Sequence, residues 1–406
     1  MPVHAAGGRG LGTGTAGAAG SAGAYSRGAA LTALFITGFA TFVDLYVTQP
    51  LLPLFLRIFH ASELEVSLTV SAPVLAVALA APVVGLFADL AGRKRVIVAA
   101  MLGLAVPTAL AATAGGLGQL IFWRFLQGLF IPGIVTVAMA YISEESPTRT
   151  GGSTMATYIT GTVVGGFSGR FVTGLCVAHW GWRTGFLCIA GLTLAGALAT
   201  WRLLPPSTNF VRRVDAADSL RSLRAHLRNP RLLATYGIGF NVLFSLVGTF
   251  TYVNFYLADR PFSLGPVALG SIFAVYLIGA AVTPAAGFIL DRAGHRGTLM
   301  GAIGVSALGL LLTLIRSIPV IVVGLALAAT GVFACQTAAS SQVGKAAREA
   351  RSSAAGLYVA LYYLGGFVGS ILPGFFWRHA GWAGCVMIIL CVQAVTAAIG
   401  NSLWKD

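Results

Sequence analysis

The sequence predicts an all-α membrane protein with twelve transmembrane helices in two pseudo-symmetric six-helix bundles. Composition is the first reason: 57% of the 406 residues are hydrophobic, 9% are charged, and the mean hydropathy is +0.84. Soluble domains carry about a quarter of their residues as charges. Run length is the second reason, because continuous apolar stretches repeatedly reach the ~20 residues that a helix needs to cross a bilayer. Continuous runs also exclude a transmembrane barrel, whose strands alternate.

An internal repeat is the third reason. Residues 158–182 read YITGTVVGGFSGRFVTGLCVAHWGW, and residues 358–382 read YVALYYLGGFVGSILPGFFWRHAGW. The residue types that recur at this offset are Tyr158, Gly165, Gly166, Phe167, Gly169, Gly174, His179, Gly181 and Trp182, each matched 200 positions later. We therefore interpret the two halves as copies of one module.

The twelve expected spans follow from the Gly, Pro and charge punctuation of the apolar runs. The first six are 30–56, 66–88, 96–114, 118–142, 153–177 and 183–204, and the second six are 232–257, 266–290, 298–315, 319–343, 354–376 and 383–403. The expected parts are a flexible cytoplasmic tail (1–28), an N-terminal six-helix bundle (29–204), a basic cytoplasmic linker (205–230) and a C-terminal six-helix bundle (231–404). The tail is rich in Gly, Ala and Ser and lacks the apolar region of a signal peptide.

The basic residues predict the orientation. With a cytoplasmic N-terminus, 19 of the 26 Lys and Arg residues lie on the cytoplasmic side, 5 lie outside and 2 lie within spans. This excess favours a multi-pass protein of a bacterial inner membrane with both termini inside. The net charge of +14 is therefore a topology signal, and we expect no nucleic-acid partner.

Two related loops carry a motif. The chain reads GLFADLAGRKRV between spans two and three, with Gly85, Asp89, Gly92 and Arg93, and GFILDRAGHRG between spans eight and nine, with Asp291 and Gly294. The first loop resembles the signature G-x-L-A-D-R-x-G-R-K of the major facilitator superfamily, with Phe87 and Leu90 departing from it. The twelve-span, two-half layout is similar to that superfamily along almost the whole chain. The resemblance implies its fold, and alternating access between the two halves.

The first loop has the chemistry of a conformational latch. Gly92 permits a tight turn, and Asp89 can receive the positive N-terminal end of a facing helix. The resemblance places that helix start near Ser352 and Ser353. Arg93 can pair with Glu144 or Glu145 beyond span four.

Three charges lie well inside the membrane: Asp44 in span one, Arg124 in span four and Arg170 in span five. Intramembrane charges are costly and by default functional. All three fall in the outer half of their spans, so they could share one proton-coupling or substrate site. The open alternative for Asp44 is a static ion pair that holds helix one to helix four. Further polar cavity candidates include Tyr46 and Tyr276 and are led by Gln49 beside Pro50 and by Gln336.

Glycines at four-residue spacing predict close helix contacts. Span five carries Gly161, Gly165 and Gly169, and span eleven carries Gly365 and Gly369. The superfamily resemblance places helices five and eleven at the boundary between the halves, so both faces are expected to be sliding surfaces. The aromatic ends AHWGW and RHAGW are expected to be anchors at the outer membrane interface.

Two other function classes are disfavoured. The chain has no phosphate-binding GxxxxGK[ST] run, no HExxH and no nucleophile elbow, which disfavours ATP-driven transport and an embedded enzyme. The five cysteines lie in apolar runs without CxxC spacing, so we expect no metal, disulfide or cofactor.

Two transport mechanisms remain open. SEESP, GGFSGR, YYLGG and the HxGW ends are similar to a YnfM-type branch of bacterial inner-membrane permeases among the drug:proton antiporters, which implies proton-coupled efflux of a small organic molecule. The proline of the antiporter motif in helix five is absent here, and Arg170 stands in that segment. The alternative is symport or exchange of a small organic anion clamped by Arg124 and Arg170. Expected partners are a small-molecule substrate, protons and lipid, and we expect a monomer.

Overall fold

The computed structural model describes residues 27–146, 151–207, 228–346 and 351–404. Within these ranges the side chains at 83, 85–91, 151, 152, 280, 284, 291, 344–346 and 351–353 lie outside the description. The predicted tail and linker therefore fall mostly outside it. So do the side chains of Asp89, Asp291, Ser352 and Ser353, which the predicted latch involves.

The described chain is built from helices. Those of the first half are α1 (Arg27–Leu45), the short 3₁₀ helix η1 (Gln49–Leu51), α2 (Leu52–Phe59), α3 (Glu63–Ala91), α4 (Arg93–Ala111), α5 (Leu117–Glu145), α6 (Gly151–Trp180) and α7 (Trp182–Leu203). Those of the second half are α9 (Pro230–Ala258), α10 (Pro266–Ile272), the 3₁₀ helix η2 (Phe273–Leu277), α11 (Ile278–Leu312), α12 (Ile318–Ala346) and α13 (Arg351–Leu403).

Eleven helical segments among the described residues are long and apolar enough to cross a membrane. One of them, Ala354–Leu403, contains a break at Ala380 and Gly381, where the backbone leaves helical geometry. Predicted spans eleven and twelve lie on either side of that break. The expected all-helical membrane fold is therefore confirmed.

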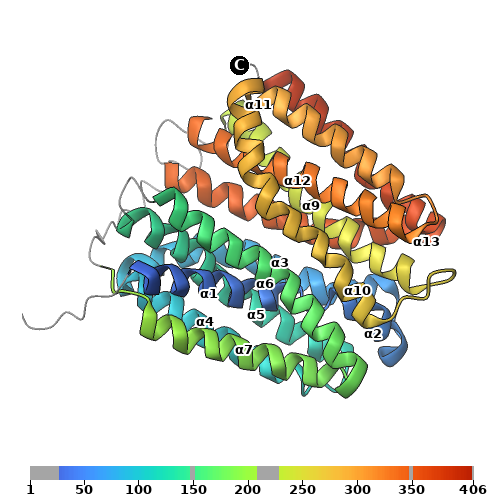
Figure 1. The fold of residues 1–406 in the computed structure, drawn as a ribbon, viewed down its shortest axis with the longest axis horizontal. Helices are drawn as coiled ribbons and strands as arrows, with labels where there is room; N and C mark the ends of the chain where they lie inside the picture. Colours follow the sequence, from blue (N-terminus) through green and yellow to red (C-terminus); the bar gives the residue numbers. More distant parts are fainter. Residues whose placement is uncertain (1–26, 147–150, 208–227, 347–350, 405–406) are drawn as a thin grey trace, which may run out of the picture.

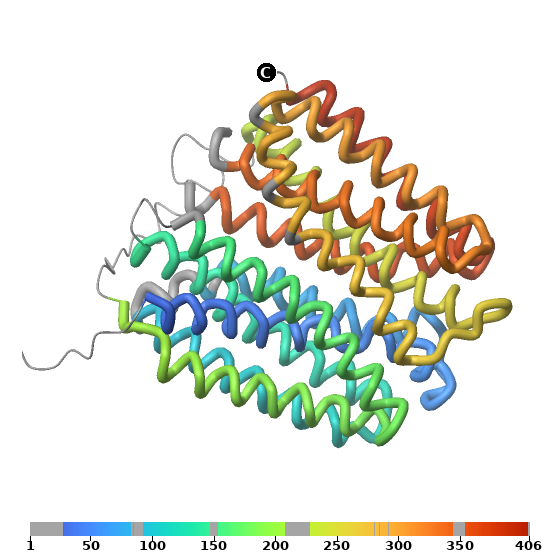
Figure 2. Tube along the Cα trace, in the orientation of Figure 1, coloured from blue at the N-terminus to red at the C-terminus, as the bar shows by residue number. Residues whose placement is uncertain are grey.

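The helices gather in two groups. Figure 1 and Figure 2 show α1–α7, coloured blue to green, on one side and α9–α13, coloured yellow to red, on the other. Within the groups α1 packs on α6 and α9 packs on α13, while α3 contacts α13 and α6 contacts α10 across the boundary. The same pairs of elements thus recur in both halves, as the repeat requires.

Left-handed glycines mark equivalent turns. Gly92 has φ +86° and Gly294 has φ +70°, while Gly181 has φ +91° and Gly381 has φ +55°. A side chain at positive φ clashes with its own backbone, so glycine is the residue that permits these turns. The turn predicted at Gly92 is confirmed, and its copy lies at Gly294.

The glycine faces pack inside each half, so the expected sliding surfaces are wrong. A Cβ atom added at Gly161, Gly165 or Gly169 would overlap the carbonyl oxygens of Phe35, Phe39 and Val43 in α1. Additions at Gly365 and Gly369 would overlap the carbonyl oxygens of Phe240 and Phe244 in α9. Small residues allow two backbones to touch, and here they join each fifth helix to the first helix of its own half. Close approach between the halves occurs instead at Gly174, where an added Cβ would lie 2.5 Å from the carbonyl oxygen of Pro266, and at Gly270, where it would lie 2.7 Å from that of Arg170.

The repeated tryptophans are also not membrane anchors. Trp182 and Trp382 are buried, and the Trp382 indole donates a 2.9 Å hydrogen bond to Thr313. Because each follows a left-handed glycine, its ring turns back into its own bundle. Trp180, which is 68% exposed, is the residue that an interfacial anchor would resemble.

Candidate functional site

Asp44 lies at the last turn of α1, where α1 meets α4, α5 and α7. Its side chain is fully buried. One carboxylate oxygen, Oδ2, accepts hydrogen bonds from Thr108 of α4 at 2.7 Å and Thr193 of α7 at 3.4 Å. The other, Oδ1, is 3.6 Å from the Arg124 Nη1 atom and has no hydrogen-bond partner among the described residues. Asp44 is thus paired but incompletely satisfied.

Arg124 of α5 forms hydrogen bonds with both the end of α1 and α3. Its Nε donates to the carbonyl of Thr69 at 3.0 Å, and Nη1 donates to the backbone carbonyl of Asp44 at 3.0 Å. Further bonds go to the carbonyl of Leu45 and to the Gln127 side chain. A helix ends with unpaired carbonyls and a negative partial charge, so an arginine here caps α1. Most N–H donors of the Arg124 guanidinium therefore already form hydrogen bonds within the protein.

Arg170 has different surroundings, although it is also buried. Its Nε donates to Gln49 Oε1 at 2.7 Å, and Nη1 donates to the carbonyl of Gly166. Three rings enclose the guanidinium, with centroids at 4.4 Å for Phe273, 4.8 Å for Tyr46 and 5.0 Å for Tyr276. These are cation–π distances. We call Arg170 and these three rings the arginine cage.

The arginine cage crosses the boundary between the halves. Arg170 and Tyr46 belong to the first half, whereas Phe273 and Tyr276 come from η2 of the second half. Gln49 adds a second link, because its Nε2 donates to Thr251 of α9 at 3.2 Å. The predicted cavity role of Gln49 therefore corresponds to a bridge between the halves.

The three intramembrane charges form two neighbouring groups instead of one shared site. Asp44 and Arg124 form an ion pair with each other. Arg170 forms no ion pair with any carboxylate among the described residues. The two groups are joined through the backbone that runs from Asp44 through Tyr46 to Gln49. Gln336 joins neither group, since it accepts a 3.0 Å hydrogen bond from Tyr358 between α12 and α13.

Among the residues described, the second half has no buried Asp, Glu, Lys or Arg to match these charges. Its buried polar cluster is neutral: Gln393 donates to Ser306 at 2.8 Å and to Ser245 at 3.4 Å, and Ser245 donates to Asn241 at 3.0 Å. The two halves are copies of one module, but the buried charges lie in the first half. We therefore look for the substrate and proton sites in the first half.

The loop motif is partly described. Arg93 pairs with Glu144 through two hydrogen bonds, Nε–Oε2 at 3.0 Å and Nη2–Oε1 at 2.7 Å, so the predicted pairing is confirmed. In the second copy His295 contacts Ser341 at 3.2 Å instead. The gating roles of Gly85, Asp89 and Asp291 stay predictions.

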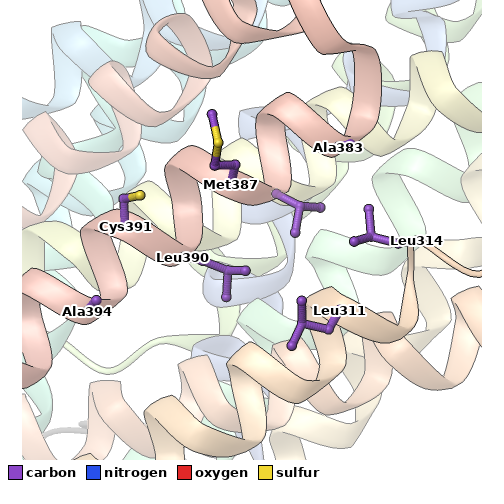
Figure 3. A pocket seen from close by; sticks show the side chains of 8 residues that line it. Leu311, Leu314, Ala383, Met387, Leu390, Cys391 and Ala394 are labelled. Atoms are coloured by element: carbon purple, nitrogen blue, oxygen red, sulfur yellow. The ribbon is translucent and has the colours of Figure 1, made fainter.

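A surface groove on the second half is not a polar site. Its walls come from α11, the turn that follows α11, and α13, as Figure 3 shows. They carry apolar, thioether or thiol side chains: Leu311, Leu314, Ala383, Val386, Met387, Leu390, Cys391 and Ala394. Leu311 and Met387 are about half exposed, as expected of residues that face lipid chains.

Sequence reasoning missed several contributors. Thr108, Thr193 and Thr251 are hydroxyl residues in apolar runs, and no spacing distinguishes them from other threonines that bond their own helix. Phe273 looks like any apolar residue of a span. Tyr46 and Tyr276, by contrast, are among the predicted polar cavity candidates, because each is a polar tip within apolar sequence, and both lie against Arg170.

Several known proteins are similar to this chain in sequence or in fold. The model of the Major Facilitator Superfamily matches residues 34–370 and 259–404. The inner membrane transport protein YnfM of Escherichia coli is 32% identical over 92% of this chain and 90% of its own length, and the uncharacterized transporter YybF of Bacillus subtilis is 33% identical over 92% and 93%. The multi-drug resistance efflux pump PmrA of Streptococcus pneumoniae is 26% identical over 59% of this chain and 56% of its own. The structure of a mutant of the nucleoside transporter NupG superposes with a TM-score of 0.76 at 16% identity, covering 92% of this chain and all of NupG.

The fold and the duplicated halves define a secondary transporter. The chain belongs to the Major Facilitator Superfamily. It is a multi-pass membrane protein that binds a small-molecule substrate, and it is not an enzyme.

Proposed function

We propose that this transporter exports a small organic molecule from the bacterial cytoplasm in exchange for protons, by alternating access of two bundles spanning residues 29–204 and 231–404. It works as a monomer in the inner membrane with both termini in the cytoplasm. The efflux direction is supported by the similarity to PmrA, which is a multi-drug resistance efflux pump.

One observation carries the proton coupling: the incomplete pairing of Asp44. Its Oδ1 lies 3.6 Å from Arg124, which is too long for a hydrogen bond, and receives no donor among the described residues. A proton on this carboxyl group would remove its charge and weaken its attraction to Arg124. An unprotonated carboxylate restores the attraction, so this pair can exist in two states.

The backbone connects this pair to the contact between halves. Arg124 holds the carbonyls of Asp44 and Leu45, where α1 ends. Four residues later, Gln49 begins η1 and bonds both Arg170 and Thr251. A change in the Asp44–Arg124 pair therefore acts on the segment that bridges to α9.

The test is substrate-driven proton movement in proteoliposomes that contain a pH-sensitive dye. Ethidium and 1-naphthoate are added in parallel, so that the assay does not presume the charge of the substrate. We expect the wild type to move protons with one of them and Asp44→Asn to move none while folding normally. Asp259→Asn, the same change at the exposed outer end of α9, is the matched control and should behave as wild type. Proton movement by Asp44→Asn at the wild-type rate would remove Asp44 from the coupling.

A further inference from the structure

The unused hydrogen-bond donors of Arg170 are the basis of a further inference. A guanidinium has five N–H groups. In the described structure two of the Arg170 groups donate, to Gln49 and to the carbonyl of Gly166. Arg124 instead makes four such bonds and pairs with Asp44. Arg170 is therefore the intramembrane cation with donors to spare.

The charge of Arg170 also lacks a protein counterpart. No carboxylate of the described residues lies within ion-pair distance of it, and its side chain is only 1% exposed. Burying an unpaired cation in a membrane protein is costly unless the charge has a use. Cation–π contacts with three rings recover part of that cost but leave the donors open.

The backbone around the arginine cage is broken on both sides. Gln49 lies in η1, and Phe273 and Tyr276 lie in η2, so 3₁₀ turns interrupt the first helix of one half and the second helix of the other. Interrupted helices near the membrane midplane commonly form transporter binding sites, and 3₁₀ stretches within helices mark hinges. The rings of η2 can thus move with the second half and uncover the guanidinium.

We propose that the transported molecule is a small organic anion with a flat apolar portion, whose carboxylate or similar oxyanion binds the free N–H groups of Arg170. The flat portion stacks on the rings of the arginine cage, and Gln49 orients the guanidinium. This substrate class rests on the proposed transport function and specifies it.

A cationic substrate fits the same geometry poorly. Asp44, the one fully buried carboxylate among the described residues, is surrounded by Arg124, Thr108 and Thr193, so no face of it meets a ligand. A cation entering the arginine cage would meet the positive charge of Arg170 in a low-dielectric site. In this proposal Asp44 binds and releases the proton, and Arg170 binds the substrate.

The experiment uses three probes of one shape and different charge: 1-naphthoate, neutral 1-naphthamide and cationic 1-naphthylmethylammonium. Binding to purified full-length protein in detergent is measured by tryptophan fluorescence and by thermal shift. We expect 1-naphthoate to bind best. Arg170→Gln should weaken its binding about ten- to a hundredfold, as expected for the loss of charge-assisted hydrogen bonds, and should leave 1-naphthamide binding nearly unchanged.

Two variants separate this contact from general damage. Arg170→Lys keeps the charge but loses the planar fork, so it should retain part of the preference for 1-naphthoate. Arg183→Gln removes another arginine, whose contacts are not with the arginine cage: it lies 4.4 Å from the Trp182 ring centroid and donates to the carbonyl of Ala114. This variant should leave all three affinities unchanged.

The outcomes distinguish the substrate class from the coupling. Preferential binding of the cation, or a naphthoate affinity that Arg170→Gln leaves unchanged, would overturn the anion proposal even if ethidium drives proton movement. Naphthoate binding that depends on Arg170, together with no proton movement in proteoliposomes, would support the anion site and refute the proton coupling.

Discussion

A double-mutant cycle at Asp44 and Arg124 tests whether the buried pair is a real energetic unit. Arg124→Gln removes the guanidinium that bonds the carbonyls of Thr69, Asp44 and Leu45, and it leaves the Asp44 carboxylate without its counter-charge. Breaking a buried pair from one side costs about 3–5 kcal/mol. We therefore expect a loss of this size in the free energy of unfolding.

Asp44→Asn should cost less. The amide can still accept hydrogen bonds from Thr108 and Thr193, and Arg124 keeps its carbonyl partners. A loss of about 1–3 kcal/mol in the free energy of unfolding is expected from the weakened polar contact. In the double variant no carboxylate is left uncompensated, so its total loss should fall short of the sum by about 1–3 kcal/mol.

The assay is reversible unfolding in mixed micelles with increasing SDS, followed by circular dichroism for the wild type, both single variants and the double variant. Arg124→Gln combined with Asp259→Asn is the control cycle and should be additive. Losses at Asp44 and Arg124 that add to within about 0.5 kcal/mol would refute the coupling of the two side chains.

Three further predictions concern packing and gating. Gly165→Ala should destabilise the protein by about 1–3 kcal/mol in the same SDS assay, because its methyl group would overlap an α1 carbonyl, whereas Gly191→Ala, with open space beside it, should not. Arg93→Gln should slow turnover in proteoliposomes, and the swap Arg93→Glu with Glu144→Arg should restore part of the rate, since their two-bond contact is reformed. Asp89→Asn should slow turnover without altering which probes bind, as expected for a gating residue.

Each of these three predictions would be contradicted by a specific result. Equal stability of the two glycine variants would mean that α1 and α6 can separate freely at this point. A swap variant as slow as the single variant would show that the Arg93 pair does not set the rate. An altered probe preference in Asp89→Asn would argue against a purely gating role.

The sequence predicted well what composition and spacing determine. Long apolar runs predict spanning helices because lipid leaves no other partner for backbone groups. The turn at Gly92 and the pairing of Arg93 with Glu144 followed from a local motif and a nearby charge. Pro50 correctly drew attention to Gln49, because a proline frees backbone groups where α1 gives way to η1.

The sequence could not predict which helices pack against one another. The spacing of Gly165 and Gly365 shows that a helix approaches closely, but not which helix. Helices α6 and α13 do lie at the boundary between the halves, but these glycines face α1 and α9, so the expected sliding role of the glycine faces was wrong. Likewise, three intramembrane charges suggested one site, whereas the direction of each side chain divides them. The break at η2 lacks a proline within it, so nothing in the sequence marked Phe273 as a partner of Arg170.

The most direct test of the link between Asp44 and the movement of the halves is a distance measurement between the end of α6 and the part of α13 just before its break. Spin labels at His179 of α6 and Arg378 of α13, both exposed, report the separation of the two halves in lipid nanodiscs. Pulsed electron paramagnetic resonance at acidic and alkaline pH should give different distance distributions for the wild type and for Asp259→Asn. Asp44→Asn should give one distribution at both pH values. A pH-dependent shift that persists in Asp44→Asn would contradict the proposal that this carboxyl group couples the proton to alternating access.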